Sequence, residues 1–249
     1  MQQRGGKTVY GASVGILMLE TRFPRIPGDI GNAGTWPFPV HYRVAEGATP
    51  DNVVRGDPLE RLDAFIEAGR ALVAMGCDGI TTNCGFLSLL QEPLKQALGV
   101  PVASSALMQA GMIQRLLAAD THVGIVTISA NTLTSAHLLA AGVPQDVPVI
   151  GTDGGVFTRD VLGDAYTIDF EACRSEVVEA GVRLVRDHPA TGAILLECTN
   201  MVPFAPDVRQ ATGLPVYSIY TLVQWFQAGL TPQVFPGRIW DARHADHPG

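Results

Sequence analysis

Short apolar runs alternate with amphipathic segments along most of the chain. The apolar runs have the length of strands and are followed by glycine or polar turn residues, which is typical of buried strands in a parallel sheet. The amphipathic segment 169–187 places valine and leucine at helical spacing among charged residues. The predicted strands are 14–19, 40–44, 78–82, 100–105, 121–128, 147–151, 192–196 and 214–219. The predicted helices are 59–75, 87–98, 106–119, 131–141, 169–187, 205–212 and 220–228.

This alternation predicts an α/β fold in which each parallel sheet is flanked by helices. The same order of elements also occurs twice: a glycine-containing strand, a strand that ends in cysteine, and a Pro-Val strand. A proline follows 17 positions after the cysteine in both halves, counted from Cys84 and from Cys198. We therefore expect two pseudo-symmetric lobes, one formed by 13–105 plus the C-terminal helix of about 220–230, the other by 106–219.

Two similar stretches, 81–86 and 197–200, each deliver a cysteine from the end of a predicted strand. Ligands of open α/β sheets bind beyond the carboxyl ends of the strands, so two facing lobes place Cys84 and Cys198 across one cleft. A thiolate on one side can remove a proton from carbon, and a thiol on the other side can return one. Nearby amides and hydroxyls can hold the developing oxygen charge. We expect Cys84 and Cys198 to be acid/base residues that need no cofactor.

Composition narrows the classes of function. The 249-residue chain has a formal net charge of −7 and no cluster of lysine or arginine, which argues against nucleic-acid binding. No apolar run reaches the roughly 18–20 residues of a membrane span, and the first residues do not resemble a secretory signal, so we expect a cytoplasmic protein that does not act on membranes. The four cysteines form no CxxC pair, so we expect free thiols and no metal site. Cys77 and Cys173 are interpreted as structural.

The segment 20–39 is rich in glycine and proline, which excludes a regular helix. It is either a lid over the site or a surface loop. Its Arg22 and Arg25 can hold a substrate carboxylate in bidentate fashion, or they can face solvent. Glu197 is interpreted as a solvated or interface carboxylate, because it points away from Cys198 along the strand. The predicted substrate-binding residues are Glu20, Arg22, Thr82, Asn83, Gly85, Phe86, Ser104, Thr127, Thr199 and Asn200.

The sequences Thr-Asn-Cys-Gly at 82–85 and Glu-Cys-Thr-Asn-Met-Val-Pro at 197–203, together with the repeat, resemble the aspartate/glutamate racemase superfamily. The resemblance extends over about residues 14–228. It implies two flavodoxin-like lobes with a cofactor-independent two-thiol site in the cleft between them. The superfamily also contains hydantoin racemases, maleate isomerases and arylmalonate decarboxylases.

The chain departs from the superfamily pattern beside both cysteines. Gly85 and Phe86 stand where amino-acid racemases carry Asn and Thr, and Glu197 replaces a glycine. In glutamate racemases, His usually stands at the position of Asn200. These departures argue against glutamate as the substrate.

We expect a racemase or epimerase that abstracts a proton next to the carboxylate or carbonyl of an amino acid or related small acid. Two alternatives are kept. The first is a lyase, decarboxylase or cis–trans isomerase of the same superfamily, in which one cysteine acts on a small carboxylic acid. The second is a two-lobed protein that binds a small acid without catalysis. Apolar helices around 107–117 and 223–226 offer a face for a homodimer or higher homo-oligomer.

Overall fold

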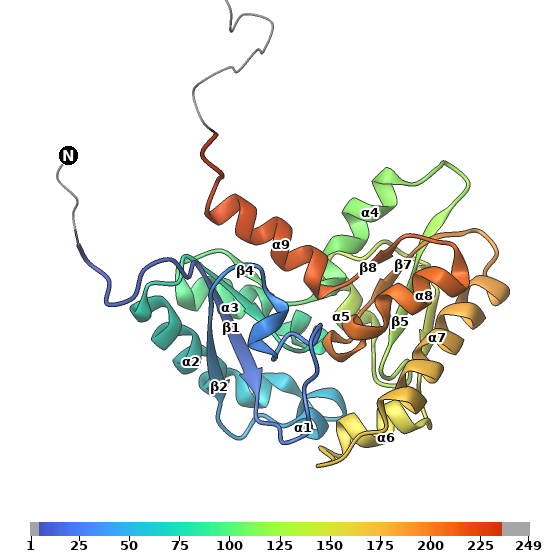
Figure 1. Ribbon diagram of the computed structural model, residues 1–249, viewed down its shortest axis with the longest axis horizontal. Coiled ribbons are helices and arrows are strands. Elements are labelled where there is room, and N and C mark those ends of the chain that lie inside the picture. The colour runs from blue at the N-terminus through green and yellow to red at the C-terminus, as the bar shows by residue number, and fades with distance from the viewer. Residues whose placement is uncertain (1–4, 236–249) are drawn as a thin grey trace, which may run out of the picture.

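Two four-stranded, all-parallel sheets form the framework of the computed structural model, which describes residues 5–235 (Figure 1). The first sheet has the order β2-β1-β3-β4 and the second has the order β6-β5-β7-β8. The strands are β1 (Val14–Leu19), β2 (Val40–Ala45), β3 (Gly79–Thr82), β4 (Val102–Ala103), β5 (His122–Thr127), β6 (Val149–Gly151), β7 (Thr191–Leu196) and β8 (Val216–Tyr217).

The two sheets repeat one topology, which confirms the predicted pair of α/β lobes. In each sheet the first strand of the half lies in the centre, and the strand that ends before a cysteine pairs with it. Leu17 of β1 lies opposite Thr82 of β3, and Val126 of β5 lies opposite Leu196 of β7. The carboxyl ends of β3 and β7 therefore occupy equivalent places in the two lobes.

Helices cover the sheets on both faces (Figure 1). In the first lobe α2 packs on β1 and β2, and in the second α7 packs on β5 and β6. The last helix, α9, contacts β3 and β4 of the first sheet as well as β8 of the second. The α-helices are α1 (Pro50–Val54), α2 (Leu62–Met75), α3 (Gln91–Leu98), α4 (Ala110–Leu116), α5 (Ser135–Ala140), α6 (Val156–Leu162), α7 (Phe170–Asp187), α8 (Ala205–Thr212) and α9 (Ile219–Leu230).

Local sequence explains where the principal helices begin and end. The Asp169 side chain accepts hydrogen bonds from the N–H groups of residues 171 and 172, so it caps the first turn of α7. Gly76 ends α2 in the left-handed conformation, at φ 109°, which a residue with a side chain rarely adopts. None of the described helices is long and apolar enough to cross a membrane.

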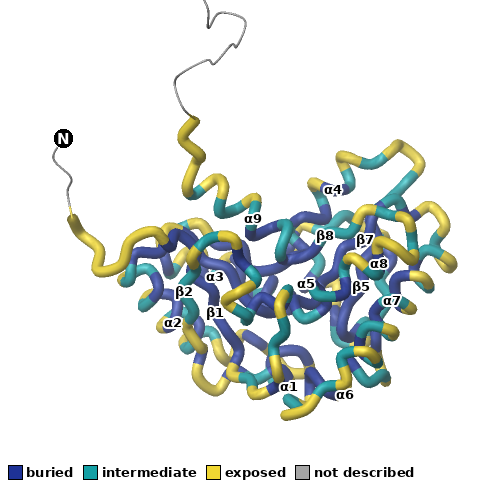
Figure 2. Tube along the Cα trace, in the orientation of Figure 1, coloured by how far each residue is buried: buried dark blue, intermediate teal, exposed yellow. Residues whose placement is uncertain are grey.

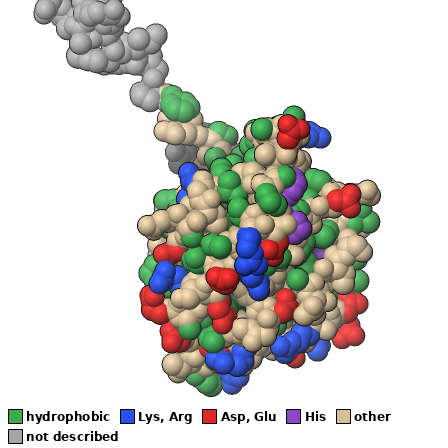
Figure 3. Space-filling view, turned by 90° about the vertical axis from the view of Figure 1, so that its right-hand side faces the viewer, with side chains coloured by type: hydrophobic (Ala, Val, Ile, Leu, Met, Phe, Trp, Pro, Cys, Tyr) green, Lys and Arg blue, Asp and Glu red, His purple; other side chains and the backbone are tan. Residues whose placement is uncertain are grey.

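The core runs along both sheets and continues between them, as the dark blue segments of Figure 2 show. All six residues of β1 are buried, as a central parallel strand requires. At the surface, basic and acidic side chains lie interspersed on the face seen in Figure 3. Three large apolar side chains remain exposed on α4 and α9, where the sequence predicts an interface between copies of the chain: Met112, Leu116 and Trp225.

Several predicted boundaries were wrong, for physical reasons. The predicted helix 87–98 begins as the 3-10 helix η3 (Gly85–Leu90), and 106–119 begins as η4 (Ala106–Gln109). Strand β4 has only two residues, because Pro101 cannot donate a ladder hydrogen bond. The short helices α1 and α6 were not predicted, since five and seven residues give little helical periodicity.

Candidate active site

The two cysteines lie at equivalent strand ends, each at the N-cap of a 3-10 helix. Cys84 follows β3 and precedes η3, and Cys198 follows β7 and precedes η5 (Thr199–Phe204). The hydroxyl of Thr199 donates a 2.6 Å hydrogen bond to the backbone carbonyl of Asn83. The residue after one cysteine is thus bonded to the residue before the other, which joins the two lobes directly beside the thiols.

Both thiols line a single cavity with an empty volume of about 340 Å³, mouth included. Its walls come from both lobes and from the segment after β1. The cysteines are nearly buried, with 9% of Cys84 and 7% of Cys198 exposed. The cavity thus lies between the two lobes, and both predicted catalytic cysteines border it. The lining residues are Leu19, Thr21, Phe23, Arg25, Pro50, Val54, Asn83, Cys84, Ile128, Val161, Leu162, Glu197, Cys198 and Asn200.

The surroundings of both thiols favour the protonated form in the empty site. Burial raises the pKa of Cys84 well above its ordinary value, and the charge of Glu197 raises it further. The N–H groups of Phe86 and Leu87 lower it, because they donate to the thiolate. Burial also raises the pKa of Cys198, with Glu197 as the second cause. A thiolate therefore needs help from a bound ligand or from a neighbouring group.

A chain of polar side chains leads from the segment after β1 to Cys198. The Arg25 guanidinium contacts the carboxylate of Asp29 at 2.7 Å, with only 11% and 5% of the two side chains exposed. The other oxygen of Asp29 accepts from the Asn200 amide at 2.6 Å. The Asn200 carbonyl oxygen in turn accepts from the Cys198 thiol at 3.6 Å. This series of contacts orients the Asn200 amide and gives the thiol proton of Cys198 a defined acceptor.

The sequence predicts Glu197 as a solvated or interface carboxylate, but in the structure its side chain is buried at the cavity. It is only 1% exposed and lines the cavity beside both thiols. Its Oε2 accepts a 2.7 Å hydrogen bond from the Thr127 hydroxyl, and its buried Oε1 has no partner among the described residues. Burial raises the pKa of Glu197 to about 7, although the Thr127 hydroxyl and the N–H of Ile128 lower it. A carboxyl with that pKa changes charge near neutral pH.

Comparisons with known proteins identify relatives along nearly the whole chain. A dimethylsulfoniopropionate lyase of Durusdinium sp. clade D is 28% identical over 225 residues, which cover 88% of this chain and 75% of the relative. Dimethylsulfoniopropionate lyase 7 of Emiliania huxleyi (strain CCMP1516) is 30% identical over 229 residues, covering 88% and 67%. The chain belongs to the family of these lyases. No family model matches it.

Several solved structures share the fold. A variant of arylmalonate decarboxylase aligns with a TM-score of 0.58 and 16% identity, covering 90% of this chain and 97% of that chain. Allantoin racemase from Klebsiella pneumoniae aligns with a TM-score of 0.56 and 19% identity, covering 91% and 95%. These likenesses show that the fold is shared. Because the curated relatives are named lyases, they favour the lyase alternative over the racemase that the sequence analysis puts first.

The structure brings four of the predicted site residues to the cavity: Cys84, Cys198, Asn83 and Asn200. Four others are buried directly behind it and hold it in shape. Thr82 donates to the Ser104 carbonyl at 2.6 Å, Thr127 donates to Glu197, and Thr199 donates to Asn83. The Ser104 hydroxyl is buried without a partner among the described residues.

The remaining predicted site residues do not line the thiol cavity. Phe86 is fully buried and packs edge-on against His137, with 5.0 Å between the ring centroids. Gly85 lies against the Glu197 carboxyl, which leaves no room for a side chain. Glu20 is exposed and accepts from the N–H of residue 47. Arg22 is 60% exposed and pairs with Asp164, so Arg25, and not Arg22, is the basic side chain at the cavity.

Three parts of the wall of the thiol cavity were not predicted. Pro50 and Val54 come from α1, Val161 and Leu162 come from α6, and Phe23 comes from the irregular segment. These residues are apolar, and on a sequence an apolar residue of a cavity wall cannot be told from one of the core. The irregular segment carries Arg25 and Phe23 to the cavity wall, so part of 20–39 does more than cover the surface. No group of three or more metal-binding side chains occurs among residues 5–235.

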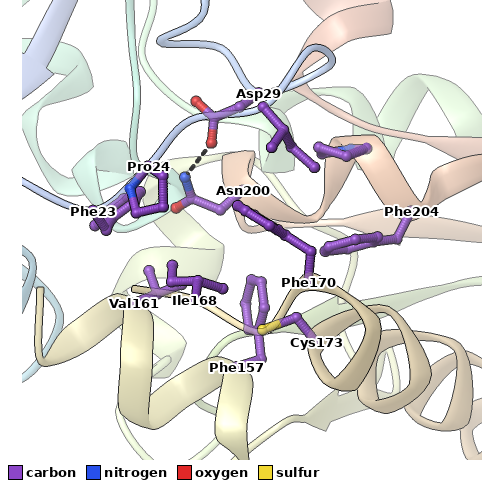
Figure 4. A pocket seen from close by; sticks show the side chains of 12 residues that line it. Phe23, Pro24, Asp29, Phe157, Val161, Ile168, Phe170, Cys173, Asn200 and Phe204 are labelled. Atoms are coloured by element: carbon purple, nitrogen blue, oxygen red, sulfur yellow. Dashed lines mark hydrogen bonds between the residues drawn. The ribbon is translucent and has the colours of Figure 1, made fainter. Parts of the chain in front are cut away.

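A second, apolar cavity lies next to the first (Figure 4). Its empty volume is about 290 Å³, and it shares Phe23, Val161 and Asn200 with the thiol cavity. Figure 4 shows Phe157, Phe170 and Phe204 around it, with the hydrogen bond between Asn200 and Asp29 at one end. Cys173 of α7 also borders it. This second cavity gives the thiol cavity an aromatic neighbour that can accept apolar groups.

Proposed function

We propose that the chain is a lyase that removes the proton from the α-carbon of a small carboxylate and expels a leaving group from the β-carbon. Dimethylsulfoniopropionate is the proposed substrate. One observation carries the proposal: two buried thiols line one small cavity in a chain whose curated relatives are named dimethylsulfoniopropionate lyases. The chain spans 75%, 65% and 67% of three of these relatives. That it shares the activity of the whole proteins is therefore a proposal.

The proposed step is a β-elimination. A thiolate takes the α-proton, the freed electron pair forms the Cα=Cβ double bond, and the Cβ–S bond breaks. Its electrons leave with dimethyl sulfide, and the other product is acrylate. The thiol that gained the proton later returns it to solvent, so atoms and charge balance. Elimination needs one base, whereas racemisation needs an acid and a base on opposite faces.

Other groups at the cavity have proposed tasks in this step. Negative charge develops on the substrate carboxylate as the α-proton leaves, and donors placed there stabilise it. Arg25 lines the cavity, and the Asn83 side chain is oriented because its carbonyl oxygen accepts from the N–H of Leu19 at 2.8 Å. That bond leaves the Asn83 amide N–H groups for the ligand. The apolar walls exclude water, which strengthens each of these interactions.

The direct test is to incubate the purified chain with dimethylsulfoniopropionate in D₂O. Gas chromatography measures dimethyl sulfide, and NMR follows acrylate and the deuterium content of the remaining substrate. We expect equal amounts of the two products and none from the Cys84→Ala/Cys198→Ala double variant. Absence of dimethyl sulfide from the folded wild-type chain would overturn the proposed substrate.

A second candidate, racemisation, is supported by the two thiols that share the cavity. In the same D₂O experiment, a panel of enantiopure amino acids and small acids would then gain deuterium at the α-carbon and lose optical activity without elimination. Exchange without elimination on any member of the panel favours the racemase. Elimination without inversion favours the lyase.

A further inference from the structure

We propose that Glu197 is the specificity residue of this site and that its carboxylate faces a small onium cation, a sulfonium or fully alkylated ammonium group, at one end of the substrate. The inference rests on the proposed function, because it concerns the same cavity. It adds the residue that recognises the cationic end of the substrate.

The placement of Glu197 is the first observation. The side chain is buried, lines the thiol cavity and is fixed on one side by the Thr127 hydroxyl, which donates to Oε2. The other oxygen, Oε1, makes no hydrogen bond within the described part of the chain. A buried carboxylate oxygen without a partner carries a large desolvation cost. A ligand group in the cavity can remove that cost if it brings positive charge.

The second observation is that Gly85, which has no side chain, leaves room for the carboxyl group of Glu197. A Cβ atom at position 85 would overlap Oε1 of Glu197 and approach its backbone carbonyl oxygen to 2.7 Å. The flexible end of the Glu197 side chain would have to move, and the backbone carbonyl could not move as easily. Gly85 and Glu197 come from different lobes, so this contact is a feature of the assembled site.

The charges that line the cavity are the third observation. Two charged residues line it, Arg25 and Glu197, and Arg25 is already paired with Asp29 at 2.7 Å. Once ionised, Glu197 therefore adds a negative charge that no described basic side chain contacts. A plain anionic substrate would be repelled by this charge. A zwitterion with a carboxylate at one end and a cation at the other fits the arrangement.

The walls favour an onium group over a primary ammonium group. An onium centre covered by methyl groups donates no hydrogen bond and is more weakly hydrated than a lysine-type ammonium, so burial costs it less. Methyl groups also match the apolar lining. The apolar side chains are Leu19, Phe23, Val54, Ile128, Val161 and Leu162.

A bound cation would also assist the thiols. The charge of Glu197 raises the pKa of both Cys84 and Cys198, which disfavours the thiolate. A cation beside the carboxylate offsets that charge, so the thiolate forms more readily when the substrate is in place. The other charged groups near the thiols are Arg25 and Asp29, which neutralise each other.

The test measures binding, and it therefore does not depend on turnover. Isothermal titration calorimetry compares 3-(trimethylammonio)propanoate with 4,4-dimethylpentanoate, which has the same shape but carbon in place of the cationic nitrogen. At pH 8 we expect the wild-type chain to prefer the cationic ligand by on the order of tenfold, about the effect of one favourable charge pair. In Glu197→Gln, which keeps an acceptor for Thr127, the two ligands should bind equally. The exposed Glu92→Gln, whose carboxylate pairs with Lys95 on the surface, serves as the control and should behave like the wild type.

The pH dependence gives a second readout. Because the pKa of Glu197 is raised to about 7, the carboxyl is largely protonated at pH 6 and ionised at pH 8. Affinity for the cationic ligand should rise over this range, and binding at pH 6 should release a proton, detected by comparing buffers with different ionisation enthalpies. Thr127→Val removes a hydrogen bond that lowers this pKa, so the rise should move to higher pH.

Two outcomes would overturn the inference. One is equal wild-type affinity for the two ligands, and the other is a preference for the cation that survives in folded Glu197→Gln. The result is separable from the proposed lyase activity. A chain that prefers the cation but releases no dimethyl sulfide keeps the onium site and loses the proposed function. A chain that releases dimethyl sulfide without that preference does the opposite.

Discussion

The ends of β3 and β7 are equivalent in backbone and unlike in chemistry. Both strands deliver a cysteine to the N-cap of a 3-10 helix. The thiol of Cys198 donates to Asn200, which is tied to the buried pair of Arg25 and Asp29. The thiol of Cys84 has no side-chain hydrogen bond among residues 5–235, and it is followed by glycine. The repeated fold thus places two thiols in one cavity, and the surrounding side chains make them unequal.

That inequality bears on the reaction. A racemase that serves both enantiomers uses each thiol as acid and as base, so similar surroundings suit it. An elimination uses one base, so only one of the two thiols has to remove the proton. The unequal surroundings agree with the names of the curated relatives, which are lyases.

The largest expected effect comes from removing each thiol in turn. Cys84→Ala and Cys198→Ala should lower the rate of proton removal by about 10²–10⁴-fold, the usual contribution of a general acid or base. If the two sites are chemically unequal, the two losses should differ. Deuterium exchange at the α-carbon and dimethyl sulfide release measure them separately. Cys77→Ala, at a buried thiol outside the cavity, is the matched control and should change the rate less than about twofold. Equal losses for the two sites would contradict the comparison.

The second expected effect comes from removing Asp29, the partner of Arg25 in the segment after β1. Asp29→Ala leaves the buried Arg25 without its partner, which should lower the free energy of unfolding by about 3–5 kcal/mol. The segment would also lose its link to Asn200 at the cavity. Chemical denaturation with urea measures the change.

The matched control for Asp29 is the exposed pair of Arg22 and Asp164. Arg22→Ala should lower the free energy of unfolding far less than Asp29→Ala does, because water screens exposed ion pairs. It should also leave turnover unchanged, since Arg22 does not line the cavity. A large fall in activity in Arg22→Ala would restore the substrate-binding role predicted from the sequence.

The smallest expected effect separates two glycines. Gly85→Ala forces the carboxyl of Glu197 to move and should lower the free energy of unfolding by about 1–3 kcal/mol. Gly229→Ala, in α9 with no atom near the added methyl group, should raise it by about 0.5–1 kcal/mol. The Gly85→Ala/Glu197→Ala double variant should lose less stability than the sum of the single variants. Strict additivity would show that the contact between the two lobes has no energetic weight.

Much of the fold could be predicted from the sequence, because its signals are local or periodic. Buried parallel strands such as β1 are continuous apolar runs, and the equal spacing from Cys84 and Cys198 to the following prolines reveals the repeat. Since ligands collect beyond the strand ends, the meeting of the two thiols in one cavity could also be predicted.

The rest could not be predicted, because it depends on contacts between distant parts of the chain. Glu197 is buried because Gly85, in the other lobe, leaves space for it and Thr127 supplies a hydrogen bond. Arg22 and Arg25 are three positions apart, and only their partners, Asp164 and Asp29, decide which one lies at the site. The predicted cytoplasmic location and homo-oligomer stay predictions.

The hydrogen bond from Thr199 to the Asn83 carbonyl has a consequence for ligand exchange. It is buried, 2.6 Å long and joins the residues next to the two cysteines, so the lobes cannot swing apart without breaking it. Entry and exit of ligands would then require movement of the cavity walls formed by α1, α6 and the loop that carries Phe23. Product release can then limit the turnover rate while the spacing of the two sulfur atoms stays constant.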